Sequence, residues 1–174
     1  MALILLRHTR PEGAEGLCYG RSDLAMAADF AAHAQRIAAQ LPEVTRILTS
    51  PLSRCRRLAE AVAALRGLPV EIDAGLVEMD FGRWENRPWQ AIPRDELDAW
   101  RDDFLAARPH GGESVQDLAD RVGAALDAAA QGARPALLVT HAGVIKAARV
   151  ALGQTDGWQS QIGFGEWMRI DTWR

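Results

Sequence analysis

Short, continuous runs of apolar residues alternate along this chain with longer segments whose apolar residues recur at helical spacing. The runs at residues 2–6, 44–49, 70–72 and 136–140 are typical of buried strands, because a strand covered on both faces needs no polar alternation. Strands that alternate with helices predict an α/β fold. We expect a three-layer α/β/α domain, with a mostly parallel sheet and helices on both of its faces.

Several of the expected helices have recognisable ends. Ser50 and Pro51 are typical of an N-cap and a first helical residue, and Gly67 is expected to end that helix. Ser114 is expected to begin another helix, with Asp117 as its partner in a capping box. The remaining expected elements are helices at residues 27–41, after Pro93 (with Leu97, Trp100 and Phe104) and at residues 142–152, and a final edge strand at residues 167–172.

Length and composition limit the class of protein. A chain of 174 residues is expected to form one domain over residues 1–174. The formal net charge of -3 provides no general basic field, so we expect no nucleic-acid partner. Two cysteines cannot form a disulfide framework, which favours a reducing compartment.

The two most apolar stretches do not predict a membrane protein. The apolar run at residues 2–6 is too short for a signal-peptide core, and no positive region precedes it. The longer stretch at residues 135–152 contains His141, Lys146 and Arg149, which a membrane-spanning helix would not favour. We therefore expect a cytoplasmic protein with no membrane partner.

Five residues whose side chains could take part in catalysis or binding follow the expected strands. Arg7 and His8 follow the first strand, and Arg54 lies in the first turn of the helix after the second. Glu78 follows the third strand and His141 follows the fourth. Each of these residues has an ordinary structural explanation by itself. Because ligands bind at the carboxyl ends of strands in such sheets, their shared placement predicts a site.

This set of side chains suits phosphoryl transfer. Two guanidinium groups can hold a phosphate through bidentate, charge-assisted hydrogen bonds. A neutral imidazole is a competent nucleophile, and a carboxyl group can protonate a leaving alkoxide. No cluster with metal-ligand spacing is present in the sequence, so we expect a mechanism without metal or cofactor.

Five motifs, in order, resemble those of the histidine phosphatase (phosphoglycerate-mutase-like) superfamily: LLRHTRP, TSPLSRCRRLAE, LVEMDFGRWEN, HGGES and LLVTHAGVIKA. The resemblance spans nearly the whole chain. It implies that His8 becomes phosphohistidine while Arg7, Arg54 and His141 hold the phosphoryl oxygens. It implies further that Glu78 protonates the leaving group and then activates water.

The resemblance also implies weaker contacts and two departures. Ser114 and the backbone amide of Ala142 are candidate contacts of the phosphoryl group. Thr9 and Asn86 stand where most or many members have glycine. The family uses the backbone carbonyl at the first of these positions to orient the nucleophile, and Thr9 retains that carbonyl.

The segment GLCYGRSDLAM is similar to the corresponding segment of α-ribazole phosphatases, which act in cobalamin biosynthesis. This likeness implies removal of a 5′-phosphate from α-ribazole phosphate or from the cobamide phosphate. Arg21 could add positive charge near the phosphate, and Tyr19 and Trp84 could offer flat faces to a base. The alternatives are a plain turn around Tyr19 and core packing of Trp84.

Other functions remain open at this stage. The same residues would serve a phosphatase for sugar phosphates, nucleotides or phosphohistidine proteins, or a mutase, which the short chain disfavours. A non-catalytic module that binds phosphorylated ligands is a further alternative, although such modules usually lack the nucleophile or the acid. Asp80 is the nearest rival of Glu78, and residues 85–104 are the expected lid. The sequence leaves open whether the protein is a monomer or a homodimer.

Overall fold

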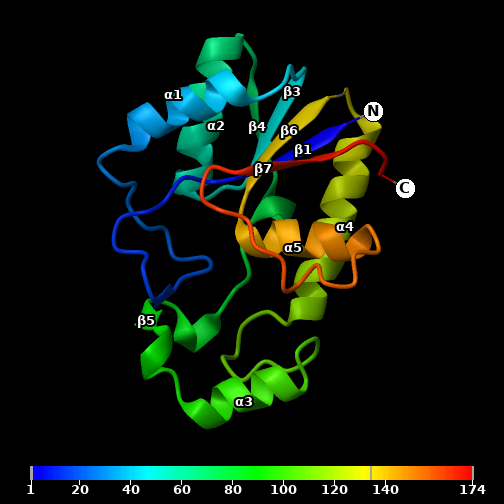
Figure 1. The fold of residues 1–174 in the computed structure, drawn as a ribbon. Coiled ribbons are helices and arrows are strands. Elements are labelled where there is room, and N and C mark those ends of the chain that lie inside the picture. The colour runs from blue at the N-terminus through cyan, green and yellow to red at the C-terminus, as the bar shows by residue number, and fades with distance from the viewer. Residues whose placement is uncertain (1, 134, 174) are drawn as a thin grey trace.

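The computed structural model describes residues 2–133 and 135–173 and is built around a five-stranded sheet (Figure 1). Neighbouring strands follow the order β4-β3-β6-β1-β7. Four strands are parallel, and β7 pairs with β1 in the antiparallel direction at one edge. The strands are β1 (Leu3–Arg7), β3 (Arg46–Thr49), β4 (Val70–Ile72), β6 (Ala136–Thr140) and β7 (Trp167–Ile170). The predicted fold class is confirmed.

Helices cover both faces of this sheet, as Figure 1 shows. On one face, α1 and α2 pack against Ile4 and Leu6 of β1. On the opposite face, α4 and α5 pack against Leu3 and Leu5. Successive side chains of a strand point to opposite faces, so a continuous apolar run is needed to supply both cores. The helices are α1 (Phe30–Gln40), α2 (Ser53–Arg66), α3 (Arg94–Asp102), α4 (Val115–Gln131) and α5 (Ala142–Ala151).

Several short elements lie between the main strands and helices, and the sequence pattern did not predict them. Strands β2 (Leu17–Cys18) and β5 (Arg87–Pro88) form a two-stranded antiparallel sheet. The 3₁₀ helices are η1 (Ala74–Leu76), η2 (Gly82–Trp84) and η3 (Trp89–Ala91). Elements of two or three residues carry too little periodicity to be distinguished from loops.

Most expected helix ends are confirmed. The Ser114 hydroxyl accepts from the Asp117 amide while the Asp117 carboxylate accepts from the Ser114 amide, which completes the capping box. Gly67 ends α2 in the left-handed conformation that glycine favours. The predicted start of α2 was wrong: the helix begins at Ser53 and Leu52 is its N-cap. Ser50 instead directs its hydroxyl toward His141.

Other boundaries differ by a few residues. The first helix begins at Phe30 rather than at residue 27, and α3 ends at Asp102, before Phe104. The last strand ends at Ile170. Apolar spacing continues past the end of a helix when the following turn also packs against the core. Phe104 lies after the end of α3 and packs against the core in this way.

An aromatic cluster fills the segment that follows Glu78. Trp84 is fully buried there, and its ring lies 4.9 Å from that of His110 and 5.7 Å from that of Trp100. Asn86, which replaces a frequent glycine, has a φ of 61°, and asparagine tolerates this left-handed region better than most residues. Residues 85–104 include β5, η3 and α3; their role as a lid stays a prediction.

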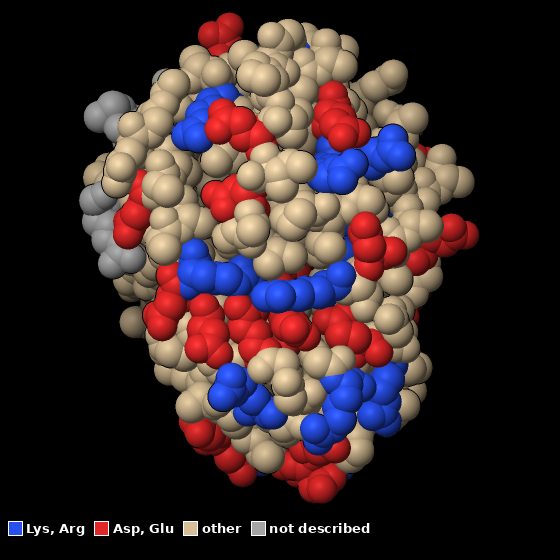
Figure 2. Space-filling model, turned by 180° about the vertical axis from the view of Figure 1, so that it is seen from behind, with Lys and Arg blue, Asp and Glu red and all other residues tan. Residues whose placement is uncertain are grey.

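The surface is mixed in charge. Figure 2 shows basic and acidic side chains in neighbouring bands on the rear face, with no broad area of one sign. Among the helices of residues 2–133 and 135–173, none combines the length and apolar character that crossing a bilayer requires.

We expect Leu138→Ala to lower the free energy of unfolding by about 2–5 kcal/mol, because the side chain is fully buried in the central strand β6. Leu65→Ala is the matched control, since that residue is 65% exposed, and it should change stability by less than about 0.5 kcal/mol. Urea unfolding of both variants measures the difference. Equal losses would contradict the placement of the core.

Candidate active site

The pairing of β1 with β6 brings two histidines together at the carboxyl edge of the sheet. Arg7 is paired with Thr140 in the parallel register, so His8 and His141 leave the two strands side by side. Their ring centroids are 5.2 Å apart. Both rings are buried. The joint placement of these residues, expected from the strand ends, is thus a consequence of strand register.

The ring of His8 is fixed at both of its nitrogen atoms. Nδ1 lies 2.7 Å from the carbonyl oxygen of Thr9, and Nε2 lies 3.3 Å from Nε of Arg54. A carbonyl only accepts hydrogen bonds, so Nδ1 carries the proton and Nε2 presents its lone pair. Burial, with the adjacent Arg54 charge, lowers the pKa of His8 to about 3. The ring is therefore neutral at physiological pH.

Arg54 is a fully buried guanidinium held by backbone carbonyls. Its Nη1 donates to the Ser22 carbonyl at 2.7 Å, and its Nη2 donates to the Gly20 carbonyl at 2.6 Å. The same segment is held by Glu85, whose carboxylate accepts from the amides of Gly20, Arg21 and Ser22. Sequence reasoning missed Glu85, because nothing in its spacing indicates that it organises a loop far away in the chain.

Arg7 supplies the second guanidinium group of the site. Its Nη1 donates to the Ile162 carbonyl at 2.6 Å, and its guanidinium carbon lies 3.8 Å from the ring centroid of Phe164. Burial lowers the pKa of Arg7, and the nearby Tyr19 and Glu78 counter part of that effect. The Tyr19 ring also lies 5.2 Å from the guanidinium carbon of Arg54. Tyr19 thus lies between the two guanidinium groups.

His141 is fully buried behind His8. Its Nε2 lies 2.8 Å from the Ser50 hydroxyl and 3.4 Å from the Cys55 sulfur. Burial, together with the neighbouring His8, lowers the pKa of His141 well below its ordinary value. Neither contact was predicted from the sequence, in which Ser50 had been interpreted as a helix cap.

Glu78 faces the first turn of α5. Its carboxylate accepts from the Gly143 amide at 3.1 Å and from its own neighbour, the Met79 amide, at 3.0 Å. A Cβ atom at position 143 would collide with this carboxylate. Gly143 therefore leaves the space that Glu78 occupies, and helix α5 contributes an N-terminal amide to an anionic side chain.

The weaker predicted contacts are distributed differently. Arg21 is partly exposed, with its Nη2 3.8 Å from the Glu113 carboxylate. Ala142 is half-buried as the first residue of α5, whereas Ser114 is buried and its hydroxyl is engaged in the capping box. Trp84 is fully buried and donates through Nε1 to Glu96 at 2.6 Å. The structure gives Trp84 no face that a ligand could reach, which favours the core-packing alternative.

Two features near the site had no signal strong enough for prediction. Lys146, the only lysine of the chain, is half-buried on α5. Burial lowers its pKa, and the nearby Glu78 counters only part of that effect. Phe164 is partly exposed, and its ring centroid lies 5.6 Å from that of His8. An isolated lysine in a helix and an isolated phenylalanine between glycines look like ordinary surface residues in a sequence.

The arrangement can hold and attack an oxyanion. The buried guanidinium of Arg54 and the half-buried guanidinium of Arg7 supply fixed positive charge, two buried imidazoles are neutral, and one carboxylate is near. Phosphoryl transfer requires positioning and neutralisation of charge more than any other assistance. Within the part of the chain that the structure describes, no group of three or more His, Cys, Asp or Glu side chains is arranged to hold a metal ion.

Comparison with known proteins agrees with this chemistry. Residues 3–171 match the model of the histidine phosphatase superfamily (branch 1). A Klebsiella pneumoniae (strain 342) protein named "Probable phosphoglycerate mutase GpmB" is 37% identical over 155 residues, which cover 81% of this chain and 69% of that protein.

Solved structures are similar over almost the whole chain. The crystal structure of the α-ribazole phosphatase from Shigella flexneri has a TM-score of 0.85 and 28% identity, and the alignment covers 98% of this chain and 90% of that one. The mycobacterial glucosyl-3-phosphoglycerate phosphatase has a TM-score of 0.83 and 26% identity, with 97% and 88% covered. The names of these relatives all refer to a phosphate ester, and the alcohol part of that ester differs from one name to the next.

We expect His8 to make the stability of the fold depend on pH. In the unfolded chain this histidine binds a proton below about pH 6.5, whereas in the folded chain it does so only near pH 3. Between these values the unfolded state binds more protons, so the free energy of unfolding falls as the pH falls. Above about pH 6.5 the effect is absent.

Urea unfolding between pH 7 and pH 4 measures this effect when the chain is compared with His8→Asn. The variant should show a shallower loss of stability, by up to about 1.4 kcal/mol per pH unit, because one proton-binding difference is removed. His141 remains in both proteins, and burial is the larger cause of its lowered pKa, so the main part of its contribution is common to the comparison. Parallel curves would contradict a neutral, buried His8.

Proposed function

The chain belongs to the histidine phosphatase superfamily (branch 1), and we propose that it is a metal-independent phosphomonoesterase acting through a phosphohistidine on His8. The observation that carries this proposal is the state of His8, a neutral ring whose Nε2 lone pair lies beside the buried Arg54 guanidinium. An incoming phosphate ester would bring its phosphorus to that nitrogen and its oxygens to the guanidinium groups.

The proposed reaction has two steps. First, Nε2 of His8 forms a bond with phosphorus as the bond to the ester oxygen breaks, and Glu78 donates a proton to the departing alkoxide. Second, water attacks the phosphohistidine, Glu78 takes a proton from that water, and the bond between nitrogen and phosphorus breaks. Arg7, Arg54 and His141 would bind the phosphoryl oxygens in both steps.

We propose α-ribazole 5′-phosphate, or the complete cobamide phosphate, as the substrate in cobalamin biosynthesis. The likeness to the Shigella flexneri α-ribazole phosphatase over nearly the whole chain supports this assignment, as does the GLCYGRSDLAM segment. The carbonyls of Gly20 and Ser22 in that segment hold Arg54, so the segment is part of the site.

A mutase is the second candidate, because the 37% identical relative is named as one. A mutase returns the phosphoryl group to an alcohol, whereas a phosphatase passes it to water. Phosphate release from α-ribazole 5′-phosphate, sugar phosphates, nucleotides and 3-phosphoglycerate, measured with EDTA present, separates the candidates. A kcat/KM far above the panel on α-ribazole 5′-phosphate supports our assignment. Isomerisation of 3-phosphoglycerate without phosphate release would overturn it.

His8→Ala should lower phosphate release by several orders of magnitude, because it removes the imidazole Nε2 that is proposed to bond to phosphorus. Rapid-quench capture of a base-stable, acid-labile phosphoprotein should succeed with the unmodified chain and fail with the variant. Substantial turnover by the variant would eliminate the proposed nucleophile.

Glu78→Gln should slow alkyl phosphates about 10²–10⁴-fold but 4-nitrophenyl phosphate less than about tenfold, because a good leaving group needs no proton. Gly143→Ala should act in the same direction with little loss of stability, since the added methyl group displaces only the end of the flexible Glu78 side chain.

Asp80→Asn is the matched control for these two variants. The Asp80 carboxylate accepts from the Gly82 amide at 2.8 Å, which gives it a structural use apart from proton transfer. Its removal should affect both classes of ester alike. A leaving-group dependence that follows Asp80 rather than Glu78 would exchange the two roles.

A further inference from the structure

Phe164 is an aromatic side chain in contact with the phosphate site and with the surface. One guanidinium, that of Arg7, lies 3.8 Å from its ring centroid, and the His8 ring is tilted against it at 5.6 Å. Even so, the residue is 39% exposed. An exposed ring that touches two residues of a buried site marks the boundary between that site and what lies outside it.

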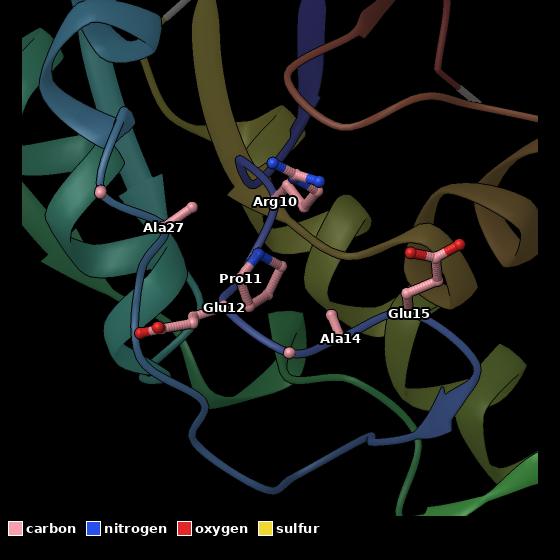
Figure 3. Close-up of a pocket in the computed structure, with 8 residues that line it drawn as sticks. Arg10, Pro11, Glu12, Ala14, Glu15 and Ala27 are labelled. Carbon is pink, nitrogen blue, oxygen red and sulfur yellow. The ribbon is translucent and has the colours of Figure 1, made fainter.

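A hollow of about 310 Å³ adjoins Phe164 and is lined also by Arg10, Ala14 and Glu15. A second hollow of about 230 Å³ shares the last three residues and extends toward Glu12 and Ala27. Figure 3 shows Arg10, Glu12 and Glu15 projecting from the loop after β1, with the two carboxylates on opposite sides. This loop is the direct continuation of the strand that ends in Arg7 and His8.

The charges of these linings indicate which ligands the hollows favour. One guanidinium and two carboxylates, those of Arg10, Glu12 and Glu15, line the larger region formed by both hollows. A ligand with a second acidic group would face the carboxylates. A neutral ligand with hydroxyl groups could donate to the carboxylates, and a flat ring could stack on Phe164.

Resting on the proposed function, we propose that Phe164 and the adjoining hollow bind the alcohol part of the substrate and select esters with a flat, uncharged ring attached to a hydroxyl-bearing sugar. The phosphate would lie against Arg7 and His8 on one side of Phe164, and the ring would stack on its exposed part. This subsite takes the role that the sequence suggested for Trp84, which is buried elsewhere.

The test compares two ribose 5-phosphate esters that differ at C1 of the sugar. α-Ribazole 5′-phosphate carries a flat base, whereas ribose 5-phosphate lacks it. Phe164→Ala should lower kcat/KM for the first ester roughly five- to 150-fold, the range expected when one stacked base loses its aromatic partner. The value for ribose 5-phosphate should change less than about threefold. Phe164→Tyr, which retains the ring, should restore the preference.

Trp167→Ala is the matched control, because this side chain is similarly exposed (37%) and lines neither hollow. It should leave both esters unaffected. Inhibition by inorganic phosphate reports on the Arg7 side of Phe164 and should be the same in all three variants. A Phe164→Ala protein that loses both esters and phosphate inhibition equally would overturn the subsite and reduce Phe164 to a support of Arg7.

The same measurements separate this inference from the function on which it rests. If the unmodified chain hydrolyses neither ester, the proposed phosphatase activity fails first. If it hydrolyses both with equal kcat/KM, the phosphatase stands and the ring subsite is overturned. A ring preference that Phe164→Ala leaves intact also overturns the subsite.

Discussion

Arg54 introduces a permanent positive charge into the interior of the protein, where it contacts an imidazole and two backbone carbonyls but, within residues 2–133 and 135–173, no carboxylate. Burying such a charge is costly unless polar partners surround it. The carbonyls of Gly20 and Ser22 meet part of that cost, and they can do so only because Glu85 holds the loop that carries them. The positive charge of Arg54 still favours a bound anion. Burial, together with the same charge, disfavours protonation of the nearby imidazoles, which explains why they are neutral.

Strand register supplies the second condition. Parallel pairing of β1 with β6 fixes the backbone of His8, whose amide donates to the Thr140 carbonyl at 2.9 Å. Strand β1 supplies Leu3 and Leu5 to one core and Ile4 and Leu6 to the other, so the packing of both cores holds in place the strand that leads into the site. Packing and chemistry are coupled here through a single strand, which ends in Arg7 and continues into the loop of Arg10.

The sequence predicted structure and site residues well where the type of a residue and its local pattern were enough to indicate its role. Apolar runs predicted the strands, and the strand ends identified Arg7, His8, Glu78 and His141 because parallel strands deliver their following residues to a common edge. It was uninformative where partners are remote in the chain. Ser50 has the appearance of a cap until folding places His141 beside it, and the value of Gly143 depends wholly on the position of Glu78. Aromatic residues were the hardest to assign, since Trp84 and Phe164 differ in burial rather than in local pattern.

The division of labour within the site explains how relatives of one fold can carry names with different substrates. The residues proposed to face the phosphate come from strand ends and helix starts, which the cores hold in place, so they have little freedom to vary. The region beside them is lined by Arg10, Ala14, Glu15 and Phe164, which belong to neither of the two large core clusters. Loops of this kind tolerate change because few packed contacts depend on them. In the proposed function, phosphate chemistry and alcohol selection are therefore carried by separate parts of the chain, and only the first rests on the five motifs that resemble those of the superfamily.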